Sequence, residues 1–281
     1  MAKFVSEDLS KIAFDSPAGL DSGEIAEIAD SLAKVFSDES SKVANEEFDL
    51  LSTIRYDPQL PENEQFFLLD YHIFRLNLAI QFFQWDIDIT AEVLLDHLKE
   101  AVKGDPTIPY KLRVLLSSDR TLKVEAYKVP QRSDLLSGLG PYTPPTSEFY
   151  KVYVDPAPTP IGPFTSFKTT HRDVYTEARN RMQLINECQD QDGRPCEILL
   201  HNPRGDVTEG SITNIALWRD GTWVTPPLVS GCLFGVTRQY LLSTGKVQER
   251  ETIAIDTVQD GERILIFNGI IGVCQGQIFR K

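Results

Sequence analysis

Thr208-Glu209-Gly210-Ser211-Ile212-Thr213-Asn214-Ile215 sets one carboxylate among small and apolar residues just before an expected strand. Such neighbours solvate a carboxylate poorly, so a glutamate here is best explained by a cation with which it pairs. The competing interpretation is a surface turn acid, because most glutamates are exposed. The flanking segments of the sequence therefore decide whether Glu209 pairs with a cation or is a surface turn acid.

Two flanking segments offer chemistry that complements Glu209. Lys168 follows a proline-containing stretch with Phe164 and Phe167. Partial desolvation of a lysine lowers its pKa and leaves a neutral amine that can form a Schiff base with an aldehyde cofactor. Gly235-Val236-Thr237 begins an expected helix, where N–H groups and a hydroxyl can bind phosphate. Together they suggest an amine, an acid and an anion-binding helix start around one small cationic cofactor.

Each of these residues also has an ordinary structural interpretation. Most lysines are surface residues, and many helices begin with a glycine. Arg75, in His72-Ile73-Phe74-Arg75-Leu76, is either a solvated helical arginine or a guanidinium that grips the same phosphate. If Glu209 pairs with a pyridinium nitrogen, the charge-assisted hydrogen bond contributes about 1.5–3 kcal/mol.

Composition limits the class of protein. The chain has 281 residues and 41% hydrophobic content, enough for one large or two modest domains. A net charge of −13 disfavours nucleic acid and anionic membranes as partners. No CxxC pair occurs among Cys188, Cys196, Cys232 and Cys274, so we expect reduced thiols and no metal site. The absence of a signal run and of a long apolar segment predicts a cytoplasmic protein.

The first half of the chain is expected to form an α+β unit. Hydrophobic spacing predicts helices at 23–36, around Ile73 to Phe83 and at 90–102. Residues 47–56, 110–117 and 121–129 are typical of strands, with Ser118-Asp119-Arg120 as a hairpin turn.

Pro130 to Ser147 lacks periodicity and is interpreted as a linker. Beyond it we expect strands at 149–154, 197–201, 211–218 and 222–224, and helices at about 170–188 and 235–242. The predicted organisation is a small N-terminal α+β domain (1–130), an interdomain linker (131–147) and a larger β-rich domain (148–281) that contains Lys168.

Taken in order, these segments resemble the fold-type IV pyridoxal-phosphate enzymes, the group of branched-chain and D-amino-acid aminotransferases and 4-amino-4-deoxychorismate lyase. The resemblance runs from about Phe48 to Val273. It rests on the matching segments Thr53-Ile54-Arg55, His72-x-x-Arg75-Leu76, Lys168, Glu209-Gly210-Ser211-x-x-Asn214, Gly235-x-Thr237-Arg238 and Asn268-Gly269. It implies a two-domain α+β fold like that of D-amino-acid aminotransferase, with pyridoxal 5'-phosphate between a small and a larger β-rich domain. It also implies a homodimer.

The resemblance assigns a role to each matching residue. Lys168 is expected to hold the cofactor and move protons at the substrate carbon. Glu209 is expected to pair with the pyridine nitrogen, with Asn214 in the same cofactor-binding segment. The phosphate is expected at Arg75, Val236 and Thr237, completed by N–H groups near Asn268, including those of Gly269 and Ile270.

Two residues favour the lyase branch of this family. Lys168 and Arg172 form a Lys-x-x-x-Arg pattern similar to that branch, and Thr53 is a candidate to relay a proton to a leaving enolpyruvyl group. Thr53 could equally be a strand residue with a satisfied hydroxyl. The implied reaction releases pyruvate from 4-amino-4-deoxychorismate and gives 4-aminobenzoate, a folate precursor.

The chain also departs from the family pattern. The family often has an aromatic residue at Leu51 and a glutamate at Ser52, so Tyr175 or Tyr240 is suggested as the contact for the cofactor's phenolic oxygen. Arg113 or Arg172 would bind the substrate carboxylate, with Arg120 also considered. The first 45 residues lack the usual opening strand pair, which suggests a fungal-type form. Two alternatives stay open: a branched-chain or D-amino-acid aminotransferase, and a non-catalytic homodimeric scaffold.

Overall fold

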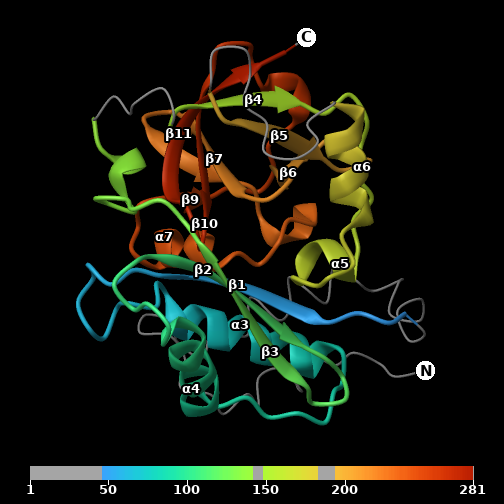
Figure 1. Ribbon diagram of the computed structural model, residues 1–281. Helices are drawn as coiled ribbons and strands as arrows, with labels where there is room; N and C mark the ends of the chain where they lie inside the picture. Colours follow the sequence, from blue (N-terminus) through green and yellow to red (C-terminus); the bar gives the residue numbers. More distant parts are fainter. Residues whose placement is uncertain (1–45, 142–147, 183–193, 281) are drawn as a thin grey trace. The chain divides into compact units, whose positions relative to one another are not determined.

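The computed structural model describes residues 46–141, 148–182 and 194–280 (Figure 1). The chain divides into two compact units that interleave along the sequence. One contains the described residues through Ser133 together with Phe167–His171, and the other contains Asp134–Ser166 and the described residues from Arg172 onward. The helix expected at 23–36, residue Cys188 and the last part of the helix expected to reach 188 lie outside the described residues. The domain limits at residues 130 and 147 remain a prediction.

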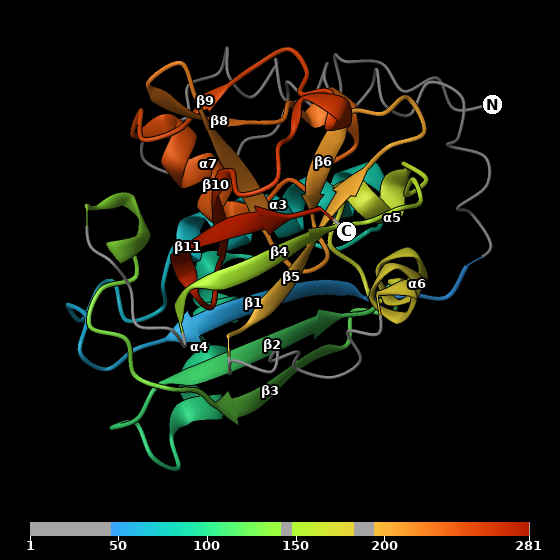
Figure 2. The same ribbon diagram turned by 90° about the horizontal axis from the view of Figure 1, so that it is seen from above.

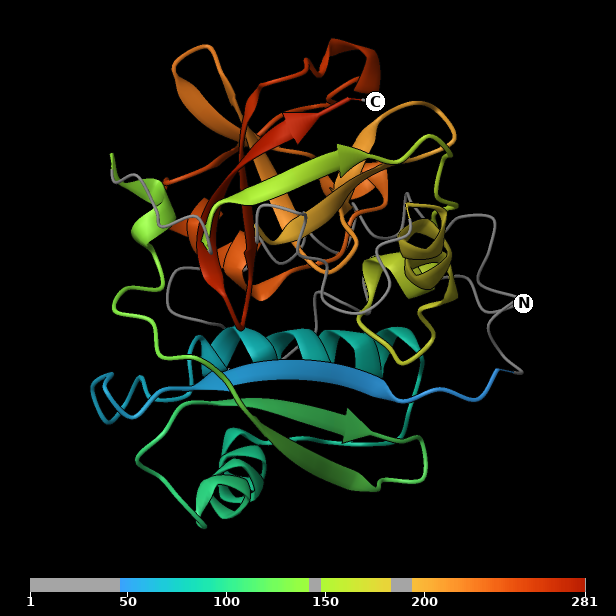
Figure 3. The same ribbon diagram turned by 45° about the horizontal axis from the view of Figure 1, so that its top comes forward.

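Among its described residues, the first unit has a three-stranded antiparallel sheet and the two helices that the sequence predicts there. Its strands run in the order β1 (Leu50–Tyr56), β2 (Tyr110–Leu116) and β3 (Leu122–Lys128) (Figure 2). Helix α3 (Leu69–Phe82) lies along β1 (Figure 3), and helix α4 (Ala91–Val102) packs mainly against β3. Thr90 caps α4 because its hydroxyl accepts the Val93 N–H at 3.2 Å.

Side chains of β1 alternate between the two faces of this sheet. Leu50 and Ile54 are fully buried, and Ser52, between them on the same face, contacts α3. Thr53 points to the opposite face, where its cross-strand partner is Arg113. The hairpin turn between β2 and β3 closes with Arg120 at φ 74°, and the Arg120 N–H donates to the Ser117 carbonyl at 3.0 Å.

The second unit is built on an eight-stranded mixed sheet with the order β6-β5-β4-β11-β10-β7-β8-β9. The strands are β4 (Tyr150–Val154), β5 (Cys196–His201), β6 (Val207–Gly210), β7 (Asn214–Arg219), β8 (Thr222–Thr225), β9 (Gln248–Glu249), β10 (Arg263–Asn268) and β11 (Gly272–Phe279). Strand β4 lies between β5 and β11 and is parallel to both (Figure 2). Fully buried aliphatic residues of these strands form its core, among them Val152, Leu199, Ile215 and Ile266.

The described part of the second unit also contains the helices α5 (Pro163–Ser166), α6 (Asp173–Arg181) and α7 (Val236–Ser243). Short 3-10 turns occur at Ser137–Leu139, Leu228–Ser230 and Ile255–Thr257. Part of the segment interpreted as a linker packs on β11, since the Val273 N–H donates to the Leu135 carbonyl at 2.7 Å. Within the described ranges, no helix is long and apolar enough to cross a membrane.

The strand expected at 211–218 is confirmed from Asn214 onward, but its predicted start was too early. The chain bends at Ser211–Thr213, and the strand β7 starts only at Asn214. Glu209 precedes β7, as expected, but itself lies within the strand β6, which the sequence did not predict. Buried Glu197 explains the bend, because its carboxylate accepts the Ser211 N–H at 3.0 Å and the Thr213 hydroxyl at 2.9 Å. These bonds replace the ladder that a continuous strand would need.

Candidate active site

Lys168 belongs to a short segment that continues the sheet of the first unit at the free edge of β1. The Leu51 N–H donates to the Lys168 carbonyl at 2.9 Å, and the Thr170 N–H donates to the Asp49 carbonyl at 2.9 Å. Leu50 and Thr169 form an antiparallel bridge. The backbone on both sides of Lys168 is therefore fixed to β1, and its half-buried side chain starts from a rigid position.

Arg75 lies on α3 in the same unit and is 4% exposed. Its Nη2 donates to the Ser52 hydroxyl at 2.9 Å, and it has no carboxylate partner within the part of the chain that the structure describes. Burial lowers the pKa of Arg75 to about 9, so the guanidinium keeps its charge near neutral pH. Because an unpaired buried charge is energetically costly, a buried guanidinium of this kind is expected to bind an anion.

His72 is one turn before Arg75 on α3 and is fully buried. Its Nδ1 lies 2.7 Å from the Ser52 hydroxyl and 3.5 Å from Arg75 Nη2, and among the described residues its Nε2 has no hydrogen-bond partner. Burial, with the charges of Arg75 and Lys168, holds the pKa of His72 well below its usual value. His72 is thus a neutral imidazole in a cationic neighbourhood.

Thr53 and Arg113 lie on the other face of this sheet. The Arg113 guanidinium is 2.9 Å from Glu125 Oε2, and Lys123 and Tyr127 also donate to this carboxylate. Hydrogen bonds from Lys123, Arg113 and Tyr127 lower the pKa of Glu125 to about 2. Arg113 is therefore already paired with a carboxylate here. Its expected role in binding substrate, like that of Thr53 in proton transfer, stays a prediction.

Glu209 lies in the second unit, is 4% exposed, and accepts hydrogen bonds from Tyr175 and Asn214. The Tyr175 hydroxyl donates to Glu209 Oε1 at 2.6 Å, and Asn214 Nδ2 donates to Oε2 at 3.4 Å. Burial, with the charge of Glu209, raises the pKa of Tyr175 well above its usual value. Tyr175 therefore keeps its proton and directs it to Glu209. Its hydroxyl is engaged within its own unit.

Arg172 extends this group of side chains. Its guanidinium lies 4.3 Å from the centre of the Tyr175 ring, and its Nη2 donates to the Ser211 carbonyl at 2.9 Å. It therefore links α6 to the bend that follows Glu209. The substrate-binding role expected for Arg172 stays a prediction.

The start of helix α7 is open to an anion. Gly235 is its N-cap residue and offers no side-chain cap, and the Thr237 hydroxyl is buried without a hydrogen-bond partner. Asn214 packs directly on Gly235, where a Cβ atom would collide with the Asn214 side-chain oxygen, and its Nδ2 donates to the Leu233 carbonyl at 3.0 Å. Asn214 thus connects Glu209 to Gly235 at the start of α7. Val236 and Thr237 follow Gly235 directly in the sequence.

The loop between β10 and β11 contains Gly269 and Ile270. The Asn268 side-chain oxygen accepts the Ile270 N–H at 2.8 Å and the Ile271 N–H at 3.0 Å, while its Nδ2 donates to the Ile212 carbonyl at 3.1 Å. The Ile270 N–H is therefore used inside the loop. The phosphate-binding role expected for Gly269 and Ile270 stays a prediction.

The contacts that shape these two groups could not be predicted from the sequence, although Ser52, His72 and Tyr175 stand out in it. Ser52, His72, Tyr175 and Glu197 gain their importance from contacts between distant positions. The four-residue spacing of Lys168 and Arg172 was visible, whereas the contact between Tyr175 and Glu209 joins residues 34 apart. The sequence carried no signal for this contact beyond a tyrosine within the helix expected at about 170–188.

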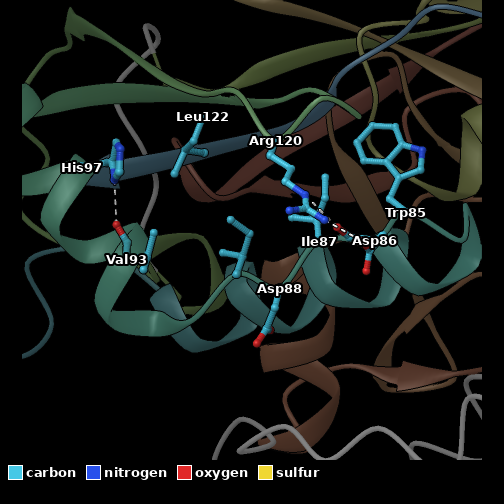
Figure 4. Close-up of a pocket in the computed structure, with 9 residues that line it drawn as sticks. Trp85, Asp86, Ile87, Asp88, Val93, His97, Arg120 and Leu122 are labelled. Carbon is cyan, nitrogen blue, oxygen red and sulfur yellow. Dashed lines mark hydrogen bonds and ion pairs between the residues drawn. The ribbon is translucent and has the colours of Figure 1, made fainter.

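A separate pocket of about 600 Å³ lies on the first unit (Figure 4). Its lining includes Trp85, Asp88, Val93, His97 and the ion pair of Asp86 with Arg120. Arg120, which was considered for the substrate carboxylate, lines this pocket, whereas Lys168, Arg75 and Glu209 are not among its lining residues.

The residues present fit pyridoxal phosphate on three observations. Arg75 is a buried cation that the described carboxylates leave unpaired, as a phosphate requires. Thr237 carries an orphaned hydroxyl at an uncapped helix start. Glu209 is a buried carboxylate oriented by two donors, as a pyridinium nitrogen requires.

Comparison with known proteins points in the same direction. The profile of the family described as "Amino-transferase class IV" matches residues 50–277. Aminodeoxychorismate lyase of Saccharomyces cerevisiae is 32% identical over 259 residues, which cover 78% of this chain and 69% of that protein. A Schizosaccharomyces pombe protein that carries the same name provisionally is 29% identical over 237 residues, 82% of this chain and 90% of its own length.

A solved structure from Mesorhizobium loti, provisionally assigned as an amino-acid aminotransferase, shares the fold. Its TM-score is 0.66 at 22% identity, and the alignment covers 83% of this chain and 100% of that one. This likeness agrees with the two-domain α+β fold expected from the sequence.

Proposed function

Because the chain belongs to the amino-transferase class IV family, we propose that it is a pyridoxal-phosphate-dependent aminodeoxychorismate lyase. The reaction would eliminate pyruvate from 4-amino-4-deoxychorismate and release 4-aminobenzoate. The observation that carries the choice of reaction is the 32% identity to the S. cerevisiae lyase. The choice of cofactor is supported by the buried, tyrosine-held Glu209 and the unpaired charge of Arg75.

The proposal gives each group of side chains a task in holding the cofactor. Lys168 would bind its aldehyde carbon through the amine, and Glu209 would accept the N–H of the pyridine ring. Arg75, the N–H groups of Val236 and Thr237, and the Thr237 hydroxyl would bind the phosphate, with Gly269 and Ile270 completing the contact. Asn214 would keep Glu209 aligned through its hydrogen bond. When bound, pyridoxal phosphate supplies an electron sink for negative charge at the substrate carbon.

Two residues would then move protons. The Lys168 amine would take the proton from the substrate ring carbon, and its fixed backbone limits where that proton can be returned. The Thr53 hydroxyl would donate to the oxygen of the departing enolpyruvyl group. Arg113 or Arg172 would hold a substrate carboxylate. Aromatisation of the ring supplies driving force, so the protein mainly has to position the amine and control reprotonation.

An aminotransferase of the same fold is the second candidate, because the family description itself names that activity. It differs from the lyase in one measurable respect. An aminotransferase needs a 2-oxo acid to complete its cycle, whereas the lyase releases pyruvate without any acceptor.

The decisive experiment combines a colour test with a product test. Purified protein incubated with the cofactor should absorb visible light, and borohydride should fix the cofactor to Lys168, which mass spectrometry of the peptide would show. Addition of 4-amino-4-deoxychorismate without any oxo acid should then give equal amounts of 4-aminobenzoate and pyruvate.

The outcomes separate the three hypotheses. No product, together with transamination of a common amino acid, would replace the lyase by the aminotransferase. A colourless protein with unmodified Lys168 would remove both enzymes and leave the scaffold. The homodimer and the cytoplasmic location remain predictions.

A further inference from the structure

Ser52 stands between two functional groups of helix α3 in the interior of the first unit. It is fully buried on β1, and its hydroxyl lies 2.9 Å from Arg75 Nη2 and 2.7 Å from His72 Nδ1. The two contacts come from residues 20 and 23 positions away, so the packing of α3 on β1 brings the hydroxyl there. One hydroxyl therefore connects the buried guanidinium to the buried imidazole.

The protons in this cluster can be assigned from donor and acceptor chemistry. A guanidinium only donates, so Ser52 Oγ accepts from Arg75. The Ser52 hydroxyl then donates its own proton to His72 Nδ1, which must be unprotonated. The remaining ring proton is on Nε2, where no acceptor contacts it in the described residues. The cluster of these three side chains therefore carries a single positive charge, that of Arg75.

This arrangement restrains Arg75 in a way that its own side chain cannot. An arginine loses up to about 2 kcal/mol of rotamer entropy when it is held in one geometry. The Ser52 hydroxyl fixes one Nη nitrogen, and His72 fixes the orientation of that hydroxyl. The Ser52–His72 hydrogen bond therefore restricts the orientation of the whole guanidinium, including the N–H groups that do not contact Ser52.

We propose that Ser52 and His72 are positioning residues that orient the Arg75 guanidinium toward the cofactor phosphate, with His72 acting as a neutral imidazole protonated on Nε2. The inference rests on the proposed function, because Arg75 is the phosphate-binding residue only if the cofactor is pyridoxal phosphate. The inference adds that the phosphate's contribution to cofactor affinity depends on Ser52 and His72, although neither side chain needs to contact the phosphate.

Pyridoxal, which lacks the phosphate, provides the test. Apoprotein is titrated with pyridoxal phosphate and, separately, with pyridoxal, and binding is followed by visible absorbance and by borohydride trapping at Lys168. Ser52→Ala should weaken pyridoxal phosphate binding by about tenfold or more, the usual effect of one hydrogen bond to a charged group. Pyridoxal binding should stay within about twofold, because the lost bond supports only the phosphate contact.

Further variants separate positioning from general damage. His72→Leu should reproduce the loss, whereas His72→Asn retains a polar atom near the position of Nδ1 and should restore most of the affinity for pyridoxal phosphate. Ser230→Ala is the matched control, since Ser230 is equally buried but donates to the Pro227 carbonyl at 2.7 Å. It should change neither affinity. If Ser52→Ala does not fold, His72→Leu tests the same hydrogen bond from the other side.

The inference is overturned if Ser52→Ala and His72→Leu leave both affinities unchanged. It is also overturned if the affinities for pyridoxal phosphate and pyridoxal fall by the same factor, because equal losses would indicate structural damage. Failure of wild-type protein to trap either ligand at Lys168 would sink the proposed function and this inference together. The trapping result therefore tells the two failures apart.

Discussion

The charge of Glu209 is the residue-scale feature on which the proposed chemistry depends most. Tyr175 donates to one of its oxygens at 2.6 Å, which leaves the carboxylate oriented and acceptor-only. We expect Glu209→Gln to lower kcat for 4-aminobenzoate release by about 10- to 100-fold, since a charge-assisted bond of about 1.5–3 kcal/mol is replaced by a neutral one. Cofactor trapping at Lys168 should persist. Full activity in this variant would mean that the pyridine nitrogen needs no carboxylate.

His72 predicts a pH dependence of stability. Burial, together with the charges of Arg75 and Lys168, holds its folded-state pKa well below 6.5, its value in an unfolded chain. As the pH falls below 6.5, the unfolded state takes up a proton that the folded state does not. The free energy of unfolding then falls by up to about 1.4 kcal/mol per pH unit, until the folded-state pKa is reached.

Urea denaturation of the apoprotein between about pH 5 and 7.5 would measure this slope. His72→Asn should flatten it, because asparagine does not titrate. The exposed His97 offers the control, and His97→Asn should leave the slope as it is in the wild type. A slope that survives His72→Asn would assign the pH dependence to other groups.

At the scale of elements, the contact between β7 and the start of α7 requires a glycine at position 235. A Cβ atom there would collide with the Asn214 side-chain oxygen. Gly235→Ala should therefore destabilise the fold by about 2 kcal/mol or more and weaken cofactor binding, because Asn214 also contacts Glu209. Gly104→Ala adds the same methyl group where nothing lies within 4 Å, so its unfolding midpoint should be unchanged.

The bend between β6 and β7 depends on a second buried carboxylate, Glu197. It is 1% exposed and accepts from Ser211, Ile212 and Thr213, with Arg179 Nη1 at 3.9 Å. Glu197→Ala should cost about 3 kcal/mol or more, because several buried donors lose their acceptor. Urea unfolding would show this. A variant as stable as wild type would mean that water replaces the carboxylate.

Across the whole molecule, the local secondary structure could be predicted from the sequence, whereas the pairing of strands far apart in the chain could not. Helices α3 and α4 and the β2–β3 hairpin follow from hydrophobic period and turn residues that act over a few positions. The parallel pairing of β4 with β11 joins segments more than 100 residues apart, and no short-range pattern encodes it. Ser52 and Thr53 must point to opposite faces of their strand, but which of them faces α3 depends on how the helix packs on β1.

The same limit applied to the candidate site. Lys168, Arg75 and Glu209 could be proposed from residue type and surroundings, and each lies in a half-buried or buried position. The sequence could not show which side chains form hydrogen bonds that orient Arg75 and Glu209. Tyr175, Ser52 and Glu197 act through contacts that folding creates, and no short-range pattern predicts those contacts.

The net charge of −13 makes a prediction about the assembly of the whole molecule. If the protein is a homodimer, sedimentation should give about 63 kDa, twice the 31.7 kDa of one chain. Two copies with this charge repel each other, and the repulsion reaches about 30 Å at 0.01 M salt but only about 8 Å at 0.15 M. The dimer should therefore tighten as salt is raised in this range. A mass of one chain at every concentration would rule out the dimer, and a dimer that weakens with salt would mean that its interface is held by opposite charges.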